Sequence, residues 1–130
     1  MDTPTRPTTD RRRAIGAAGE EYAAQHLERR GYTILDRNFR TRAGELDIVA
    51  ANDRALVFCE VKALLASTGR DPLEAITPRK RAKVRCMASA WLAARTGSCP
   101  HVPDLRFDAI GVLLDDAHSL VALEHIEGAF

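Results

Sequence analysis

The sequence lacks the segments that mark membrane-embedded and exported proteins. No stretch approaches the roughly 18 consecutive apolar residues that a membrane-spanning helix requires, so we expect no contact with a bilayer. The N-terminus, MDTPTRPTTDRRR, contains arginine and proline, but no apolar segment follows, which argues against a secretory signal. We therefore expect residues 1–12 to form a flexible, solvated tail and residues 13–130 to form a single domain with one core.

Cysteine is scarce, and its spacing fits neither a disulfide framework nor a zinc site. The three cysteines, at positions 59, 86 and 99, cannot all pair with one another, and no CxxC or Cys/His ligand spacing is present. Structural zinc is therefore not expected, and a reducing cytoplasm is the predicted compartment. The four histidines, at positions 26, 101, 118 and 125, are equally scattered, which favours surface or core polar roles over catalysis.

The net charge is only +1, and by itself it predicts no partner. The charges are unevenly distributed, however. Residues 79–95 contain six basic residues and no acidic one, whereas residues 104–130 contain six acidic residues and a single basic one, Arg106. The basic stretch could meet phosphates, and a solvated helix face explains it equally well.

Apolar periodicity predicts two helices and five strands. The first helix is expected from about residue 13 to residue 30, with Gly31 as its C-cap. The second is expected from Pro78 to about Thr96, with Thr77 as its N-cap and Gly97 at its end. The strands are expected at residues 32–40, 45–51, 55–62, 105–114 and 120–126, with residues 63–71 as a loop. Short turns between the first three strands suggest an antiparallel meander. This order predicts an α/β (α+β) domain with a central mixed sheet flanked by helices.

Strand alternation brings a small group of charged residues together. Glu60 and Lys62 must share one face of their strand, because side chains alternate along a strand. Asp47 is expected on the face opposite to Leu46 and Ile48. If the second and third strands form a hairpin with an even-numbered loop, Asp47 lies on the same face as Glu60, whereas an odd-numbered loop would separate them.

Two facing carboxylates require a positive partner, because like charges at close range destabilise each other. A divalent cation with oxygen ligands would supply it, and Lys62 would add a second positive charge. This arrangement suits phosphodiester hydrolysis, in which a metal activates water and a lysine orients or deprotonates it. An exposed Glu–Lys pair on a half-solvated sheet is the alternative for so short a motif. Glu20, on the flank of the first helix, could reach into the same cleft, and Glu45 is expected to order its turn.

The motifs GE (ending at Glu20), GYTILDRNFR, GELDIVA, LVFCEVK, PLEAITPRK and RFD occur in one order that resembles the bacterial YraN-like family. That family belongs with archaeal Holliday-junction resolvases and restriction-type enzymes in the PD-(D/E)xK nuclease superfamily. The resemblance covers about residues 13–123. It implies a restriction-endonuclease-like domain with a five-stranded sheet.

The resemblance also implies a function: Mg²⁺- or Mn²⁺-dependent cleavage of DNA, including branched or structured DNA. By residue-by-residue correspondence, Asp47, Glu60 and Lys62 are the expected catalytic residues, and Glu20 resembles a helical glutamate that completes the metal site with Asp47 and Glu60. Junction-cleaving relatives act as dimers, which implies a homodimer here. Leu64 stands where the family usually has an arginine, so one phosphate contact is lost.

Five basic residues are candidates for contacts with nucleic acid, DNA rather than RNA: Arg40, Arg42, Arg79, Lys80 and Lys83. A solvated turn is the alternative for the first two, and a lysine lying over the rim of the core is the alternative for Lys80. Asp108 is expected to form an internal ion pair with Arg106 rather than to bind metal. The competing hypothesis for the whole chain is a non-catalytic module that keeps the nuclease fold to bind nucleic acid or protein.

Overall fold

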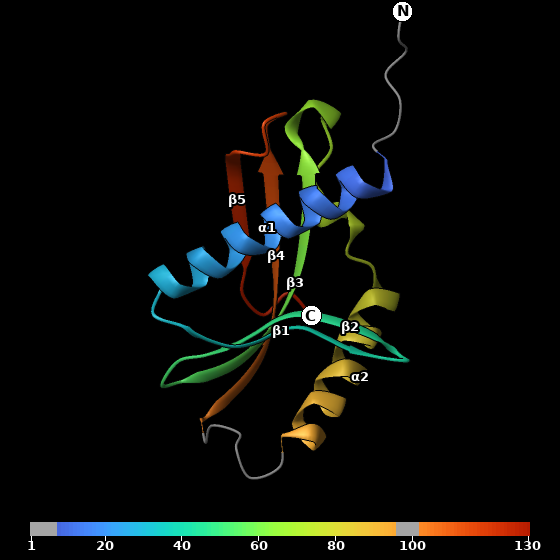
Figure 1. The fold of residues 1–130 in the computed structure, drawn as a ribbon. Coiled ribbons are helices and arrows are strands. Elements are labelled where there is room, and N and C mark those ends of the chain that lie inside the picture. The colour runs from blue at the N-terminus through green and yellow to red at the C-terminus, as the bar shows by residue number, and fades with distance from the viewer. Residues whose placement is uncertain (1–7, 96–101) are drawn as a thin grey trace, which may run out of the picture.

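A computed structural model describes residues 8–95 and 102–130 (Figure 1). The elements are α1 (Thr9–Arg29), β1 (Thr33–Thr41), β2 (Gly44–Ala51), β3 (Ala55–Leu65), the 3₁₀ turns η1 (Ala66–Thr68) and η2 (Pro72–Ala75), α2 (Pro78–Ala94), β4 (Asp104–Leu114) and β5 (Leu120–Ile126). Among the described residues, no helix is both long and apolar enough to cross a membrane. The predicted helix end at positions 96–97, Cys99, His101 and tail residues 1–7 lie outside the described ranges.

The five strands form one mixed sheet in the order β1-β2-β3-β4-β5. The first three strands form an antiparallel meander, as predicted, and β4 and β5 are also antiparallel. Only β3 and β4 run parallel, because the chain between them passes through α2. The predicted fold class is therefore confirmed: an α+β fold consistent with a restriction-endonuclease-like domain.

Two predicted boundaries were wrong. Helix α1 begins at Thr9 rather than near residue 13, because the Thr8 hydroxyl accepts a hydrogen bond from Arg11 N at 3.2 Å and caps the first turn. Strand β3 continues to Leu65 through residues that were expected to form a loop, because residues 63–65 stay in parallel register with β4. Backbone pairing with a distant strand thus outweighed the local loop signal.

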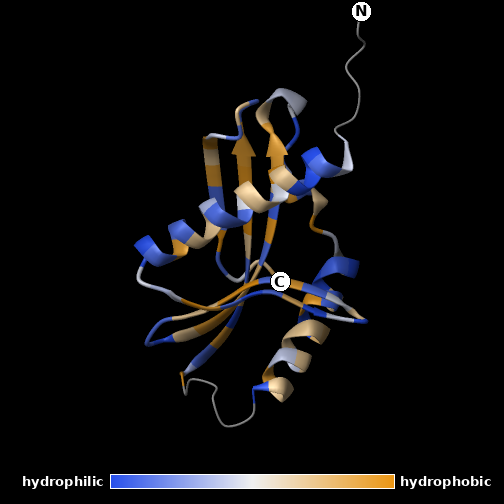
Figure 2. Cartoon of the chain, viewed as in Figure 1, coloured by the Kyte–Doolittle hydropathy of each residue, from blue (hydrophilic) through white to orange (hydrophobic). Residues whose placement is uncertain are grey.

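The helices divide the core into two hydrophobic clusters, one on each face of the sheet. On one face, α1 crosses β3 and β4 and packs through Leu27 against β3 and β4 side chains such as Cys59 and Ile110 (Figure 1). On the other face, α2 packs through Trp91 against Phe58, and both side chains have no exposed surface. Hydrophobic residues concentrate along β3 and β4 (Figure 2), as expected for strands buried between layers, whereas the edge strand β5 is mostly exposed.

Strands β2 and β3 separate before either of them ends. Their pairing comprises four residue pairs, from Ala51↔Leu56 to Ile48↔Cys59, whereas β2 begins at Gly44 and β3 runs on to Leu65. In Figure 1 the β1–β2 hairpin crosses the direction of β3 and β4. Within the described residues, β3 therefore has no partner strand on its β2 side beyond Cys59.

Side-chain alternation fails at this separation. Leu46 belongs to the cluster beneath α2 and Ile48 to the cluster beneath α1, so the prediction that they share a face was wrong. On β1, the β1–β2 register places Asn38 across from Asp47, and Asn38 has a φ of 54°. A left-handed residue rotates the backbone out of regular pleating, and asparagine tolerates that conformation better than most residues.

Helix α1 approaches β3 most closely at Gly19. A Cβ atom built at Gly19 would overlap the Ala63 side chain, and Gly19 is buried. Only a residue without a side chain fits at this crossing. Because Glu20 follows Gly19 directly, this close contact also holds Glu20 near the place where β2 and β3 stop pairing.

Replacement of Gly19 by alanine should therefore destabilise the protein, by about 1–3 kcal/mol for an overpacked contact. Gly16, one turn earlier on the same helix, is the matched control, because nothing lies within 4 Å of a Cβ built there. Gly16→Ala should raise stability by up to about 1 kcal/mol through helix propensity. Chemical denaturation of both variants measures the difference, and a Gly19→Ala variant as stable as Gly16→Ala would contradict the close crossing.

Candidate metal centre

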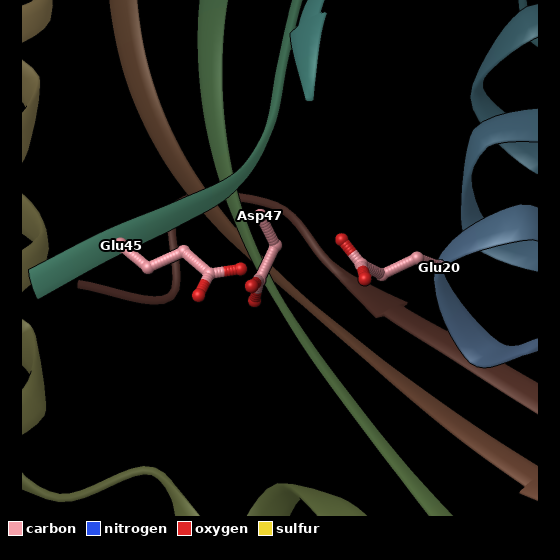
Figure 3. Close-up of side chains that lie close together, drawn as sticks. All are labelled: Glu20, Glu45 and Asp47. Atoms are coloured by element: carbon pink, nitrogen blue, oxygen red, sulfur yellow. The ribbon is translucent and has the colours of Figure 1, made fainter. Parts of the chain in front are cut away.

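Three carboxylates converge where β2 and β3 separate. Glu20 comes from α1, and Glu45 and Asp47 come from β2; each offers one oxygen, and these oxygens lie within 4.8 Å of one another. Figure 3 shows Asp47 between the two glutamates, with Glu20 reaching towards it from α1. Hard oxygen donors at this spacing could hold a metal ion.

Asp47 is held in place by the backbone of the neighbouring strand. Its Oδ2 accepts a hydrogen bond from Val61 N at 2.8 Å, just beyond the last β2–β3 residue pair. Burial is the main cause that raises the pKa of Asp47 to about 7, with smaller contributions from the charges of Glu60, Glu20 and Glu45 and an opposing effect of the Val61 hydrogen bond. The site thus holds a carboxylate that is costly to ionise without a cation nearby.

The carboxylates of Glu60 and Glu20 are also costly to ionise, because their pKa values are raised. Burial raises the pKa of Glu60, and Glu45 adds to the effect, while Lys80 and Lys62 lower it. Burial also raises the pKa of Glu20, again with a contribution from Glu45, and two arginines oppose the rise. Burial, with repulsion from Glu45, therefore raises both pKa values by more than the surrounding basic side chains lower them.

The turn between β2 and β3 has an even number of residues, which was the condition set for bringing Asp47 near Glu60. Asn52 N donates to Ala55 O at 3.0 Å, so a two-residue turn links β2 and β3. The four pairs that follow have the register this turn requires, and they end at Ile48↔Cys59, one residue before Asp47 and Glu60. The carboxylate of Glu60 nevertheless stays outside the three-residue cluster, towards Lys62 and Lys80.

Sequence reasoning gave Glu45 too small a role and missed Asn38 altogether. A role in ordering its loop or in facing solvent was favoured for Glu45 over a direct metal contact, yet its carboxylate joins the cluster and also pairs with Arg40 at 3.3 Å. When the Asn38 amide nitrogen faces the acids, it donates to Glu45 Oε1 and Glu20 Oε1, both at 2.8 Å. Asn38 thus bridges α1 and β2, and the available signal was its position on the strand facing Asp47.

The five predicted nucleic-acid contacts differ in their placement. Lys80 lies half-buried in the first turn of α2 and is close enough to Glu60 to lower its pKa. Arg40 borders the acidic cluster through its pair with Glu45. The remaining three, Arg42, Arg79 and Lys83, are exposed.

The predicted internal ion pair of Asp108 is confirmed, and it is separate from the acidic cluster. Asp108 has no exposed surface and binds Arg106 through both oxygens, at 2.8 and 2.9 Å. His125 Nε2 lies 2.7 Å from Asp108 Oδ2, and His125 Nδ1 lies 3.0 Å from His26 Nε2. This network satisfies a buried charge and explains two of the scattered histidines as core polar residues.

Comparison with known proteins now defines the family. The sequence model of the uncharacterised protein family UPF0102 matches residues 19–112. A UPF0102 protein of Acidothermus cellulolyticus is 42% identical over 132 residues, covering 95% of this chain and 98% of the relative. Another, from Bifidobacterium longum subsp. infantis, is 45% identical over 117 residues, covering 89% of this chain and 92% of the relative. The chain belongs to the UPF0102 family. The UPF0102 match spans the acidic cluster, Glu60 and Lys62, and it confirms the resemblance found in the sequence.

The raised pKa of Asp47 predicts a pH-dependent stability of the metal-free protein. The pKa rises from 3.8 to about 7 on folding, so the folded state binds more protons in that interval and stability falls as pH rises through it. Asp47→Asn keeps an oxygen for Val61 N but removes the charge. At pH 8 in EDTA it should be more stable than the wild type by about 1–3 kcal/mol, with little difference at pH 4.

Thermal denaturation across this pH range measures the effect, with the exposed turn residue Asp53→Asn as the control. Addition of Mn²⁺ at pH 8 should raise the melting temperature of the wild type more than that of Asp47→Asn. A wild-type stability that does not fall between pH 4 and pH 8, or an Asp47→Asn variant without added stability, would show that Asp47 ionises freely.

Proposed function

We propose that this protein is a Mg²⁺- or Mn²⁺-dependent endonuclease that hydrolyses phosphodiester bonds of DNA. The observation that supports this most is the convergence of the Glu20, Glu45 and Asp47 carboxylates, with Glu60, Lys62 and Lys80 beside them. Membership of UPF0102 alone names no activity. The argument for a nuclease therefore rests on the chemistry of these residues and on the superfamily pattern that the sequence resembles.

The metal ligands would be Asp47, Glu20 and Glu60, with Glu45 as a further oxygen donor. When bound, a divalent cation lowers the pKa of a coordinated water and offsets charge that develops on the phosphate. Asp47 would be the fixed ligand, because the Val61 hydrogen bond holds its carboxylate in place. Asn38 would hold Glu20 and Glu45 at the distance that a shared ion requires.

The two lysines would act on the substrate side of the centre. Lys62 stands two residues after Glu60, on the same face of β3, and would orient the attacking water or hold its proton. Lys80 approaches from the first turn of α2 and would bind a phosphate oxygen, supported by the helix N-terminus. Both lysines lower the pKa of Glu60, which supports a position close to its carboxylate.

The exposed basic residues would position the nucleic acid. Arg40, Arg42, Arg79 and Lys83 would contact backbone phosphates without reading sequence. Such contacts release counterions, so DNA binding should weaken steeply as salt is added. Branched and structured DNA are the first substrates to examine, and a homodimer and a cytoplasmic location remain part of this proposal.

A nicking assay with Mg²⁺ or Mn²⁺ on junction, flap, single-stranded and duplex DNA tests the proposal. Asp47→Asn and Lys62→Ala should each cut at least about 100-fold more slowly than the wild type, as expected for loss of a metal ligand or an acid–base group. The exposed residue Asp116, in the turn between β4 and β5, provides the control variant Asp116→Asn, which should cut at the wild-type rate.

Two results would contradict the proposal in different ways. If the wild type cuts DNA and Asp47→Asn or Lys62→Ala cuts equally well, the residue assignment is wrong. If the wild type binds DNA in a salt-sensitive manner, but neither cuts DNA nor binds Mn²⁺ by calorimetry, the chain is a non-catalytic binding module.

A further inference from the structure

A groove of about 600 Å³ begins beside Lys62 and follows the unpaired edge of β3. The first turns of α1 form its opposite wall, one turn before Gly19 and Glu20. Its volume lies within the range of about 300–1,000 Å³ that is usual for small-molecule sites. The groove therefore adjoins the candidate metal centre without sharing its acidic residues.

The charges around this groove are all positive. Arg12, Lys62 and Arg70 line it, and no acidic residue does. Arg12 and Arg70 are exposed, and in the described part of the chain none of the three cations forms an ion pair within 4.0 Å. This contrasts with Arg37, Arg40 and Arg106, which all pair with carboxylates. Unpaired cations that surround one hollow favour an anionic occupant.

The floor of the groove is apolar, so a ligand that fits the groove should carry an apolar or aromatic part as well as negative charge. Ile15, Val61, Ala63, Leu64 and Leu65 line it between the cations. In duplex DNA the bases are stacked and paired, so duplex DNA presents mainly phosphates and sugars to such a surface. An unpaired nucleotide instead offers a flat base for the apolar floor and a phosphate for the cations.

A second hollow, of about 790 Å³, borders the acidic cluster at Glu45. Arg13 and Arg40 line it together with Thr41, Gly44 and Glu45. Arg12 and Arg13 are consecutive residues of α1, so the start of this helix contributes a cation to each hollow. Arginines therefore line both hollows.

We infer that the groove lined by Arg12, Lys62 and Arg70 binds an unpaired DNA strand next to the phosphate that is cleaved. This inference rests on the proposed nuclease function and specifies its substrate class as DNA with a single-stranded segment. Arg12 and Arg70 bind the phosphates of that segment, and Leu64 supports a base.

Fluorescence anisotropy with labelled oligothymidylate and a duplex of equal length, both in EDTA, tests the groove without requiring cleavage. The wild type should bind the single strand more tightly than the duplex. The double variant Arg12→Glu/Arg70→Glu should lose at least about 10-fold in single-strand affinity, because two phosphate contacts become repulsive. The matched charge reversal Arg29→Glu/Arg54→Glu, at exposed positions outside the groove, should change it by less than about 3-fold.

Leu64→Trp provides a test with the opposite sign. An aromatic side chain on the floor should stack on a base and raise single-strand affinity by roughly 5-fold, with quenched tryptophan fluorescence and no gain for the duplex. The groove inference is overturned if Arg12→Glu/Arg70→Glu binds the single strand as the wild type does, or if Leu64→Trp affects both DNAs equally.

Failure of this inference can be told apart from failure of the proposed function. If the wild type cuts DNA with Mn²⁺, but the groove variants bind and cut single-stranded and duplex substrates alike, only the groove assignment fails. If no combination of metal ion and DNA substrate gives cleavage, yet Arg12→Glu/Arg70→Glu loses single-strand binding in EDTA, the groove assignment holds and the nuclease proposal fails.

Discussion

The hydrogen bond from Val61 N to Asp47 Oδ2 is the interaction on which the site depends. It forms where β2 and β3 stop pairing, and it uses a side chain to satisfy a backbone donor that a ladder partner would otherwise satisfy. The bond holds a carboxylate inside the separation between the strands rather than on the outer surface of the sheet. Glu20 can meet it there because α1 crosses β3 at Gly19, and Glu45 can meet it because both residues belong to β2.

The acids at this site are also difficult to ionise. The pKa values of Asp47, Glu20 and Glu60 are all raised, first by burial and then by one another or by Glu45. Elsewhere the protein surrounds a buried acid with partners. The Asp108 carboxylate accepts hydrogen bonds from Arg106 and from the backbone amide of Gly128, and it also contacts His125 Nε2. Among the described residues, the acids near β2 lack such a network of partners, and their carboxylates form a cluster that could hold a metal ion. Such uncompensated charge is typical of functional sites, where local stability is given up.

The sequence predicted those features that depend on local periodicity. An even-numbered turn was set as the condition for placing Asp47 near Glu60, and such a turn is present, although the pairing of β2 with β3 stops one residue before them. Prediction from the sequence failed where distant contacts decide the outcome. Alternation fails between Leu46 and Ile48, beside the left-handed Asn38 of β1, and pairing with β4 extends β3 into the expected loop. The roles of Glu45 and Asn38, and the groove beside Lys62, depend on how close α1 comes to the sheet, which periodicity does not encode.

Anomalous diffraction from a crystal of the protein soaked in Mn²⁺ tests the central claim most directly. The account predicts one ion at the separation of β2 and β3, about 2.1 Å from an Asp47 oxygen, with at least one of Glu20, Glu45 and Glu60 as a second protein ligand and waters completing the shell. An ion bound only elsewhere, or no ion in this position at saturating Mn²⁺ and pH 8, would contradict it.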